Sequence, residues 1–313
     1  MLNRALTKAK SVAIGGHIRP DGDCVGSCMG LYLYIKNNYS NVDVDLYLED
    51  IPESFKKFFA HTNEILHEIQ EKKYDLFIAL DCADSNRLGF SNVLFKKAKN
   101  TLCIDHHISN QSFADENHIV PEASSTAELV YRLLDKKNIT TEIAEYLFLG
   151  IVHDTGVFQY SSTAPETMEA AADLMRRNIR ANEMIDKTFY EKTYAQNKIL
   201  GKALEESYLL SEGKIIVSCI TKEMMNDYGV IPKDLEGIVS QLRVTEGVEV
   251  AVFLYQIEED EFKVSLRASN DVDVSKVAEA FNGGGHKKAA GVSIKGTSKE
   301  IIEQLAKQIQ TQL

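Results

Sequence analysis

The stretch GGHIRPDGDCVGS, residues 15–27, directly follows the apolar run 12–14 near the start of the chain. Within seven residues it carries His17, Asp21 and Asp23. Carboxylates this close together repel one another unless a positive charge lies between them. An apolar strand that ends in such side chains is typical of an open α/β sheet, which binds its ligands beyond the carboxyl ends of its strands. The stretch therefore predicts a strand that leads into a binding site for a cation.

The rest of the first half alternates short apolar runs with helical patterns. Such an alternation favours a doubly wound parallel sheet, because a helix then carries the chain back across the sheet after each strand. The predicted strands are 11–15, 42–49, 75–80 and 101–105. The predicted helices are 25–36, 125–136, 141–153, 166–177 and 181–191. The expected fold class is therefore α/β.

The pattern changes after the helical stretch 195–210, and the second half is predicted to form a smaller α/β domain. Residues 258–260 are expected to form a hairpin turn between two of its strands. The predicted strands are 214–220, 248–257 and 261–269, and the predicted helices are 274–281 and 298–310. The expected organisation, with a catalytic cleft between the two domains, is an N-terminal domain over 1–190, a connecting helix or linker over 191–212 and a C-terminal domain over 213–313.

The bulk composition limits the possible functions. A chain of 313 residues is long enough for two domains, and its net charge of −11 argues against sequence-independent binding of long nucleic acid. It contains no apolar run of eighteen residues, so no membrane span is expected. The five cysteines are scattered without a CxxC pair, which is typical of a protein from a reducing cytoplasm.

Further carboxylates and histidines stand at the ends of other predicted elements. Asp81 follows one strand, Asp105, His106 and His107 end another, and Asp154 ends a helix. A single Asp in such a place is most often a helix cap or a turn residue. Several clusters in one α/β domain indicate a shared site instead, because the carboxyl ends of parallel strands meet at one edge of the sheet.

The residue types in these clusters suit a divalent metal ion. Carboxylates and imidazoles, with no cysteine needed, suit a borderline-hard ion such as Mn²⁺. The supply exceeds the needs of one ion, and two ions about 3.5–4 Å apart, bridged by one carboxylate, can clamp a phosphate and activate a water. The predicted positive charge is therefore a metal pair, and its candidate ligands lie among the clusters formed by His17, Asp21 and Asp23, by Asp81, by residues 105–107 and by Asp154.

The second half carries one further motif, NGGGHKKAAG over residues 282–291. Glycines let backbone N–H groups approach an anion closely, and the histidine and lysines of the motif add cationic donors. An arginine on the strand upstream could make a bidentate contact to phosphate. A plain glycine turn is the alternative interpretation, but a phosphate loop is what a site for phosphoryl cleavage would require opposite it. The candidate binding residues are Arg267, Gly283, Gly284, Gly285 and His286.

Five motifs follow one another along nearly the whole chain, namely HIRPDGDCVGS at 17–27, DCAD at 81–84, DHH at 105–107, HDTG at 153–156 and GGGH at 283–286. Together they resemble the DHH-family phosphoesterases, and more narrowly the branch with a DHH-associated C-terminal domain. That branch contains the bifunctional oligoribonucleases, which act on very short RNA and are also pAp phosphatases.

The resemblance implies a role for each candidate metal ligand. In the family pattern one carboxylate bridges two Mn²⁺ ions, and the other ligands are divided between them. One ion would be held by His17 and Asp21, the other by Asp23, His106 and Asp154, with Asp81 as the bridge.

The resemblance also implies roles for the remaining candidates. His107 would contact the scissile phosphate or assist its leaving group, and Asp105 would orient a histidine. Arg267, the three glycines of the GGGH motif and His286 would bind another phosphate or the terminal nucleotide of the substrate.

The expected activity is a Mn²⁺-dependent phosphodiesterase that hydrolyses very short RNA and linear dinucleotides such as pApA to 5′-mononucleotides, with removal of the 3′-phosphate from pAp in the same site. The alternative enzyme is a cyclic di-AMP phosphodiesterase, which the same family contains. The alternative from another class is a nucleotide-sensing module that binds without cleaving, although such a module would be expected to lose metal ligands. The resemblance further implies a homodimer.

Overall fold

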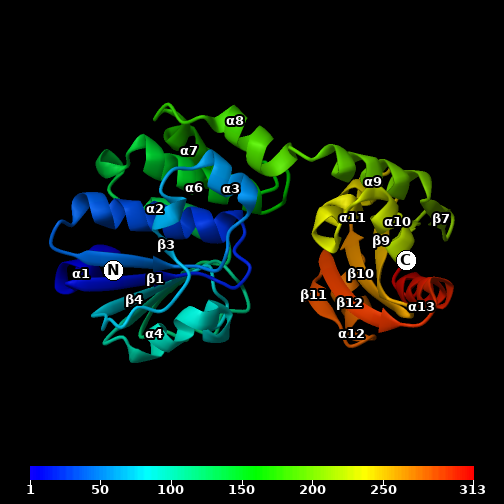
Figure 1. Cartoon of the computed structure of the whole chain (residues 1–313), viewed down its shortest axis with the longest axis horizontal. Coiled ribbons are helices and arrows are strands. Elements are labelled where there is room, and N and C mark those ends of the chain that lie inside the picture. Colours follow the sequence, from blue (N-terminus) through cyan, green and yellow to red (C-terminus); the bar gives the residue numbers. More distant parts are fainter. The chain divides into compact units, whose positions relative to one another are not determined.

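The computed structural model describes all residues, 1–313, and the chain divides into two compact units, Met1–Glu191 and Lys192–Leu313 (Figure 1). Each unit has a six-stranded sheet and apolar clusters of its own. None of the helices is both long enough and apolar enough to cross a membrane. The cleft expected between the domains stays a prediction.

The sheet of the first unit is parallel throughout, with the strand order β3-β2-β1-β4-β5-β6. The winding of the chain reverses between β1 and β4, and an α/β sheet binds ligands at such a reversal. The predicted doubly wound parallel sheet is therefore confirmed. The strands are β1 Ser11–Gly15, β2 Asp43–Tyr47, β3 Ile65–Leu66, β4 Leu76–Leu80, β5 Thr101–Asp105 and β6 Glu116–Ile119.

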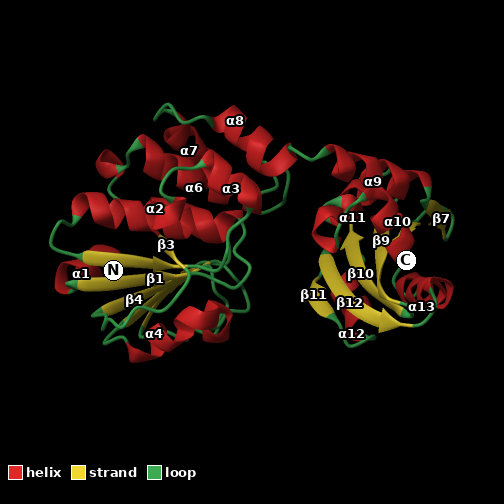
Figure 2. Ribbon diagram, in the orientation of Figure 1, coloured by secondary structure: helices red, strands yellow, loops and turns green.

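Helices cover both faces of this sheet (Figure 2). One face packs against helices of the largest apolar cluster, and the other packs against α4. The helices are α1 Leu2–Lys8, α2 Gly22–Asn38, α3 Glu53–Phe58, α4 Asn92–Lys97, α5 Thr126–Leu133, α6 Thr141–Asp154, α7 Pro165–Met175 and α8 Ala181–Ile185. The helix predicted over 125–136 ends at Leu133, and the one predicted over 181–191 continues after Ile185 as a wider π-helical turn.

Two glycines allow α2 and α6 to approach each other closely. A Cβ atom at Gly26 would lie 2.4 Å from the carbonyl oxygen of Tyr146, and one at Gly150 would lie 2.7 Å from Oδ1 of Asp23. Real Cβ atoms do not tolerate such distances, so neither position accepts a side chain without movement of the helices. The close packing brings the end of α6, with Asp154, toward the first turn of α2.

The second unit has a mixed sheet with the strand order β11-β12-β10-β9-β8-β7, in which only β8 and β9 run parallel. Apolar clusters lie on both faces of the sheet. The strands are β7 Tyr208–Leu210, β8 Ile215–Ile220, β9 Val250–Glu258, β10 Glu261–Ala268, β11 Gly284–His286 and β12 Ala289–Lys295. The helices are α9 Tyr194–Glu205, α10 Lys222–Tyr228, α11 Ile238–Arg243, α12 Val274–Glu279 and α13 Ser298–Gln310.

Two expectations for this unit are wrong in detail. The helix predicted over 195–210 ends at Glu205, and Tyr208–Leu210 form β7 instead. The next residues, Ser211 to Gly213, all have positive φ angles, which turn the chain back so that β7 pairs with β8. The glycine motif, predicted as a loop, forms the short strand β11 in a hairpin with β12. The hairpin turn between β9 and β10 is confirmed.

Candidate active site

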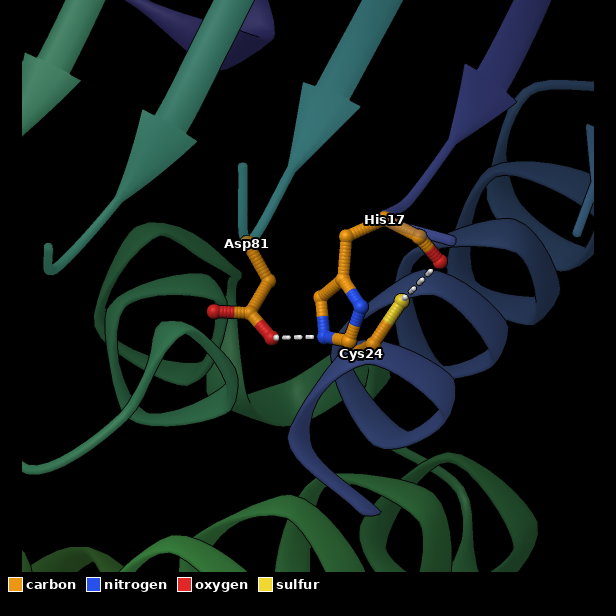
Figure 3. Close-up of side chains that lie close together, drawn as sticks. All are labelled: His17, Cys24 and Asp81. Carbon is orange, nitrogen blue, oxygen red and sulfur yellow. Dashed lines mark hydrogen bonds and ion pairs between the residues drawn. The ribbon is translucent and has the colours of Figure 1, made fainter. Parts of the chain in front are cut away.

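The ends of β1 and β4, at the reversal point of the parallel sheet, carry His17 and Asp81. Figure 3 shows the two side chains pointing toward each other from neighbouring strands, and Nε2 of His17 lies 3.3 Å from Oδ2 of Asp81. Asp81 has a φ angle of +57°, in the left-handed region that Asp tolerates better than most residues. Both side chains are buried, so two polar groups are brought together in an environment with little water.

His17 is oriented from both sides of its ring. Nδ1–H donates to the carbonyl of Ile18 at 2.8 Å, and Nε2 faces Asp81 and, at 3.6 Å, Oδ1 of Asp21. Burial lowers the pKa of His17, but the contacts with Asp21 and Asp81 outweigh burial and raise the pKa to about 12. The two carboxylates therefore hold positive charge at Nε2, the atom that would bind a metal ion.

Asp21 does two things with one oxygen atom. It is the N-cap of α2, and its Oδ1 accepts from the backbone N–H groups of Asp23 and Cys24, each at 3.1 Å. The same Oδ1 is the atom that faces His17. The helix-cap role that a single Asp at a strand end would suggest is thus real at this position, and it leaves Oδ2 available to a ligand.

A second cluster surrounds His106, just beyond β5. Its Nε2 lies 3.3 Å from Oδ2 of Asp154, 3.7 Å from Oδ1 of Asp81 and 3.9 Å from Oδ2 of Asp23. The structure therefore brings together all six residues that the sequence proposes as metal ligands. Asp81 presents Oδ2 to His17 and Oδ1 to His106, so its two oxygen atoms face different clusters.

The electrostatics of the second cluster favour a cation. Burial raises the pKa of Asp23 well above its usual value, and the charges of Asp81 and Asp154 raise it further. Burial also raises the pKa of Asp154 to about 7, although His106 acts in the opposite direction. Three carboxylates this close together are costly to ionise in a buried site, and a divalent cation among them would remove that cost.

His107 lies beside the clusters and is held by Asp105. Its Nδ1 is 2.7 Å from Oδ1 of the fully buried Asp105 and 3.7 Å from Oδ1 of Asp81. The hydrogen bond to Asp105 raises the pKa of His107 above its usual value, despite burial. With Nδ1 occupied, the ring has Nε2 to present to a substrate.

Three further residues support the site, and none of them is among the candidates predicted from the sequence. Asn110 donates to Oδ2 of Asp105 at 2.7 Å and to the carbonyl of Cys82 at 2.8 Å. Thr126 Oγ1 donates to Oδ1 of Asp81 at 3.2 Å, and the N–H groups of Thr126 and Ala127 donate to Asp23. No sequence pattern marks these residues, because their partners are set by the tertiary fold.

Cys24 lies next to the first cluster. Its thiol is fully buried and lies 3.9 Å from the carbonyl oxygen of His17, a contact drawn in Figure 3. The donor atoms of His17, Cys24 and Asp81 all lie within 4.8 Å of one another. Burial raises the pKa of the Cys24 thiol well above its usual value.

The candidate substrate residues of the second unit line up across three strands. Arg267 on β10 is opposite Ala289 on β12, and Ala289 is in turn opposite His286 on β11. Directly opposed residues of antiparallel strands point to the same face, so Arg267 and His286 share one face of the sheet with only a methyl group between their positions. The guanidinium of Arg267 also donates to the carbonyl of Leu266 at 3.0 Å.

The three glycines of the GGGH motif differ in what they permit. A Cβ atom at Gly283 would lie 2.5 Å from Cβ of Val292, and one at Gly285, where φ is +151°, would lie 2.4 Å from the carbonyl oxygen of Ala289. Those two glycines are required by the tight hairpin itself. Gly284 has no atom within 4 Å of such a position, so its backbone is open to a ligand.

Models of two protein families match the chain. The model described as the DHH family, N-terminal domain, matches residues 11–151, and the DHHA1 domain model matches residues 212–313. The bifunctional oligoribonuclease and PAP phosphatase NrnA of Thermus thermophilus is 30% identical over 295 residues, which cover 91% of this chain and 84% of that protein. The protein of the same name from Bacillus subtilis is 26% identical over 298 residues, with coverages of 94% and 92%.

One solved structure is similar over almost the whole chain. It is an exopolyphosphatase-related protein from Bacteroides fragilis, 25% identical, with a TM-score of 0.91 over 99% of this chain and 94% of that chain. This likeness agrees with the mixed α/β architecture described above.

Proposed function

Because the chain belongs to the DHH family and is a hydrolase of phosphoester bonds, we propose that it cleaves very short RNA and linear dinucleotides such as pApA to 5′-mononucleotides. The proposal includes removal of the 3′-phosphate from pAp. The relatives from Thermus thermophilus and Bacillus subtilis carry both kinds of activity in their names, which supports it. The resemblance expected from the sequence motifs is confirmed, whereas the homodimer and the cytoplasmic location stay predictions.

The observation that carries the proposal is the position of the Asp81 carboxylate between two clusters. One oxygen atom is 3.3 Å from His17 and the other is 3.7 Å from His106. A carboxylate placed in this way suits a bridge between two cations, which is the arrangement that sites for phosphoryl hydrolysis use.

The donor set fits two Mn²⁺ ions. Only carboxylates and imidazoles are required, and these are ligands that Mn²⁺ accepts. When bound, such a pair would polarise the phosphoryl oxygens and lower the pKa of a water molecule. In this proposal one ion is held by His17, Asp21 and Asp81, and the other by Asp23, Asp81, His106 and Asp154.

The side chains around the proposed metals have roles of their own. Asp105 holds Nδ1 of His107 and raises the pKa of His107, so the ring can carry a proton near neutral pH. We propose that Nε2–H of His107 contacts the scissile phosphate and gives a proton to the leaving oxygen. Asn110 keeps Asp105 in place for this purpose.

The second unit is proposed to bind a further phosphate or the terminal nucleotide of the same substrate. Arg267 and His286 present cationic or hydrogen-bonding groups on one face of the sheet, and Gly284 leaves its backbone open. An arginine can make a bidentate contact to phosphate, which gives direction as well as affinity.

A product time course on four substrates tests the proposal. Equal amounts of enzyme with Mn²⁺ are given pApA, a short RNA oligonucleotide, pAp or cyclic di-AMP, and Asp81→Asn is the matched inactive control. We expect 5′-mononucleotides from the first two, AMP from pAp, and much slower cleavage of cyclic di-AMP. Faster cleavage of cyclic di-AMP than of pApA would assign the enzyme to the cyclic substrate, and no turnover of any substrate would contradict the proposal.

A further inference from the structure

The first turn of α5 contacts carboxylates of both clusters. The backbone N–H of Thr126 donates to Oδ2 of Asp23 at 2.7 Å, and that of Ala127 donates to Oδ1 of Asp23 at 2.8 Å. The hydroxyl of Thr126 donates to Oδ1 of Asp81 at 3.2 Å. One fully buried residue therefore contacts two of the proposed metal ligands, through its backbone and through its side chain.

The hydroxyl contact matters because of what Asp81 has to do. The last torsion of an Asp side chain has a broad energy profile, so the carboxylate plane is not set by the chain itself. Here the plane has to present Oδ2 to His17 and Oδ1 to His106 at the same time. A donor fixed to Oδ1 selects that orientation over the rotated ones.

The turn that carries Thr126 is itself firmly held. Glu128, fully buried in the same first turn of α5, accepts from the hydroxyl of Ser124 at 2.5 Å and from the hydroxyl of Thr167 at 2.9 Å. The carboxylate of Glu128 also forms an ion pair with Arg132. Ser125 caps the helix by accepting from the N–H of Glu128 at 3.0 Å. The start of α5 is thus anchored to α7, away from the metal ligands.

We propose that Thr126 is a positioning residue of the metal centre. Its hydroxyl sets the rotation of the Asp81 carboxylate, and its backbone N–H, together with that of Ala127, sets the carboxylate of Asp23. This inference rests on the proposed function, because it concerns the ligands of the proposed metal pair. Groups that hydrogen-bond to metal ligands typically contribute about 10–100-fold to metal affinity or activity.

The test compares substitutions that each remove one buried hydroxyl. Thr126→Val removes the hydroxyl and keeps the backbone N–H, so it isolates the contact with Asp81. Ser91→Ala removes another buried hydroxyl of the first unit, which donates to the carbonyl of Leu88 at 2.9 Å and not to a carboxylate of the clusters. Thr126→Ser keeps the hydroxyl and serves as the rescue. Mn²⁺ affinity and stoichiometry are measured by calorimetry on each full-length variant, beside the melting temperature.

We expect Thr126→Val to bind Mn²⁺ about 10–100-fold more weakly in at least one site, with a matching shift in the Mn²⁺ concentration needed for hydrolysis of pApA. Thr126→Ser and Ser91→Ala should bind as the wild type does, even where Ser91→Ala lowers the melting temperature. Should Thr126→Val fail to fold, Thr126→Ala carries the same expectation.

Two results would overturn the positioning role. One is wild-type Mn²⁺ affinity in Thr126→Val, and the other is an equal loss of affinity in Ser91→Ala, which would indicate general destabilisation. Both presuppose that the wild-type chain binds Mn²⁺. A wild-type chain that binds none would contradict the proposed metal centre first, and the role of Thr126 with it, so the two failures are distinguishable.

Discussion

The two units offer candidate sites of opposite character. In the first unit the carboxylates of Asp23, Asp81 and Asp105 are almost fully buried and accept hydrogen bonds from neighbouring elements. In the second unit the side chain of His286 is exposed, and the backbone of Gly284 has open space beside it. The first arrangement is held by hydrogen bonds within the protein, whereas the second presents groups on an open strand face.

The difference indicates that the two units have different roles. A site for metal-assisted chemistry profits from fixed groups in a dry environment, where each electrostatic contact is strong. A site that recognises one end of a substrate needs only a few directed contacts on an accessible surface. We therefore expect substitutions in the first unit to affect every substrate, and substitutions in the second unit to affect only substrates that reach it.

The largest effect is expected from Asp81→Asn, which keeps the size of the side chain and removes the charge between the two clusters. The loss of one electrostatic group in an active site costs about 10²–10³ in rate, and Asp81 faces both clusters, so a loss of about 10³-fold or more is expected. Steady-state rates on pApA and on bis-p-nitrophenyl phosphate, with calorimetric titration of Mn²⁺, measure it.

The fold of this variant should survive, because apolar residues of β1, β4 and β5 hold the sheet. A melting temperature close to that of the wild type would show this. Normal binding of two Mn²⁺ ions with unchanged turnover in Asp81→Asn would be incompatible with the bridging role.

The next effect concerns His107→Asn. If the ring assists the leaving group, the turnover of pApA should fall by about 10²-fold, while the Mn²⁺ content stays nearly intact. The turnover of bis-p-nitrophenyl phosphate should fall less, because p-nitrophenolate leaves without a proton. Metal analysis of the purified variant beside its kcat is the measurement. The donor atoms of Asp81, His106 and His107 lie within 4.8 Å of one another, so loss of a full metal equivalent would make His107 a metal ligand instead.

The sequence alone could predict four of the six strands and the clustered ligands of the first unit, but not β3 or β6. Each ligand follows or ends an apolar run or a helix, and parallel topology then brings them together at one edge. It could not predict Thr126, whose hydroxyl acceptor Asp81 lies 45 positions away, or the supporting role of Asn110. Such contacts depend on how a turn packs, and a polar residue in a turn has no distinctive pattern.

In the second unit the sequence could predict β8, β9 and β10 but not β7, β11 or the seven-residue β12. β7 and β11 have three residues each, too few for a periodic pattern. The glycine motif indicated an anion loop, whereas Gly283 and Gly285 are needed first by the β11–β12 hairpin. Only the register of β10, β12 and β11 reveals that Arg267 and His286 lie on one face.

A smaller and more selective effect is expected from Arg267→Ala and His286→Ala. A charge-assisted contact contributes about 1.5–3 kcal/mol, which corresponds to about one to two powers of ten in kcat/KM. The loss should appear with pApA and be far smaller with bis-p-nitrophenyl phosphate, which reaches only the proposed metals. Mn²⁺ affinity should not change in either variant.

The control for this pair is the melting temperature of each variant. Arg267 is partly buried and donates to a backbone carbonyl, so its removal could weaken the second unit in general. His286, on the exposed strand β11, is the cleaner of the two. Equal losses of kcat/KM on both substrates, together with lowered melting temperatures, would refute the proposed substrate contact of Arg267 and His286. The β11–β12 hairpin would then be a purely structural feature.

The smallest expected effect concerns the wild-type protein: the slope of Mn²⁺ affinity against pH should change near pH 7. Metal binding has to displace the proton of His17, whose pKa is raised to about 12, and below about pH 7 also that of Asp154, whose pKa is raised to about 7. Each displaced proton adds about a tenfold loss of affinity per unit fall in pH. The affinity should therefore fall throughout as pH is lowered, and more steeply below pH 7 than above it.

Calorimetric titrations of Mn²⁺ across this range, corrected for buffer protonation, give the slope. A constant slope through pH 7 would mean that Asp154 binds the metal without releasing a proton in this pH range. Burial would then not raise the pKa of Asp154.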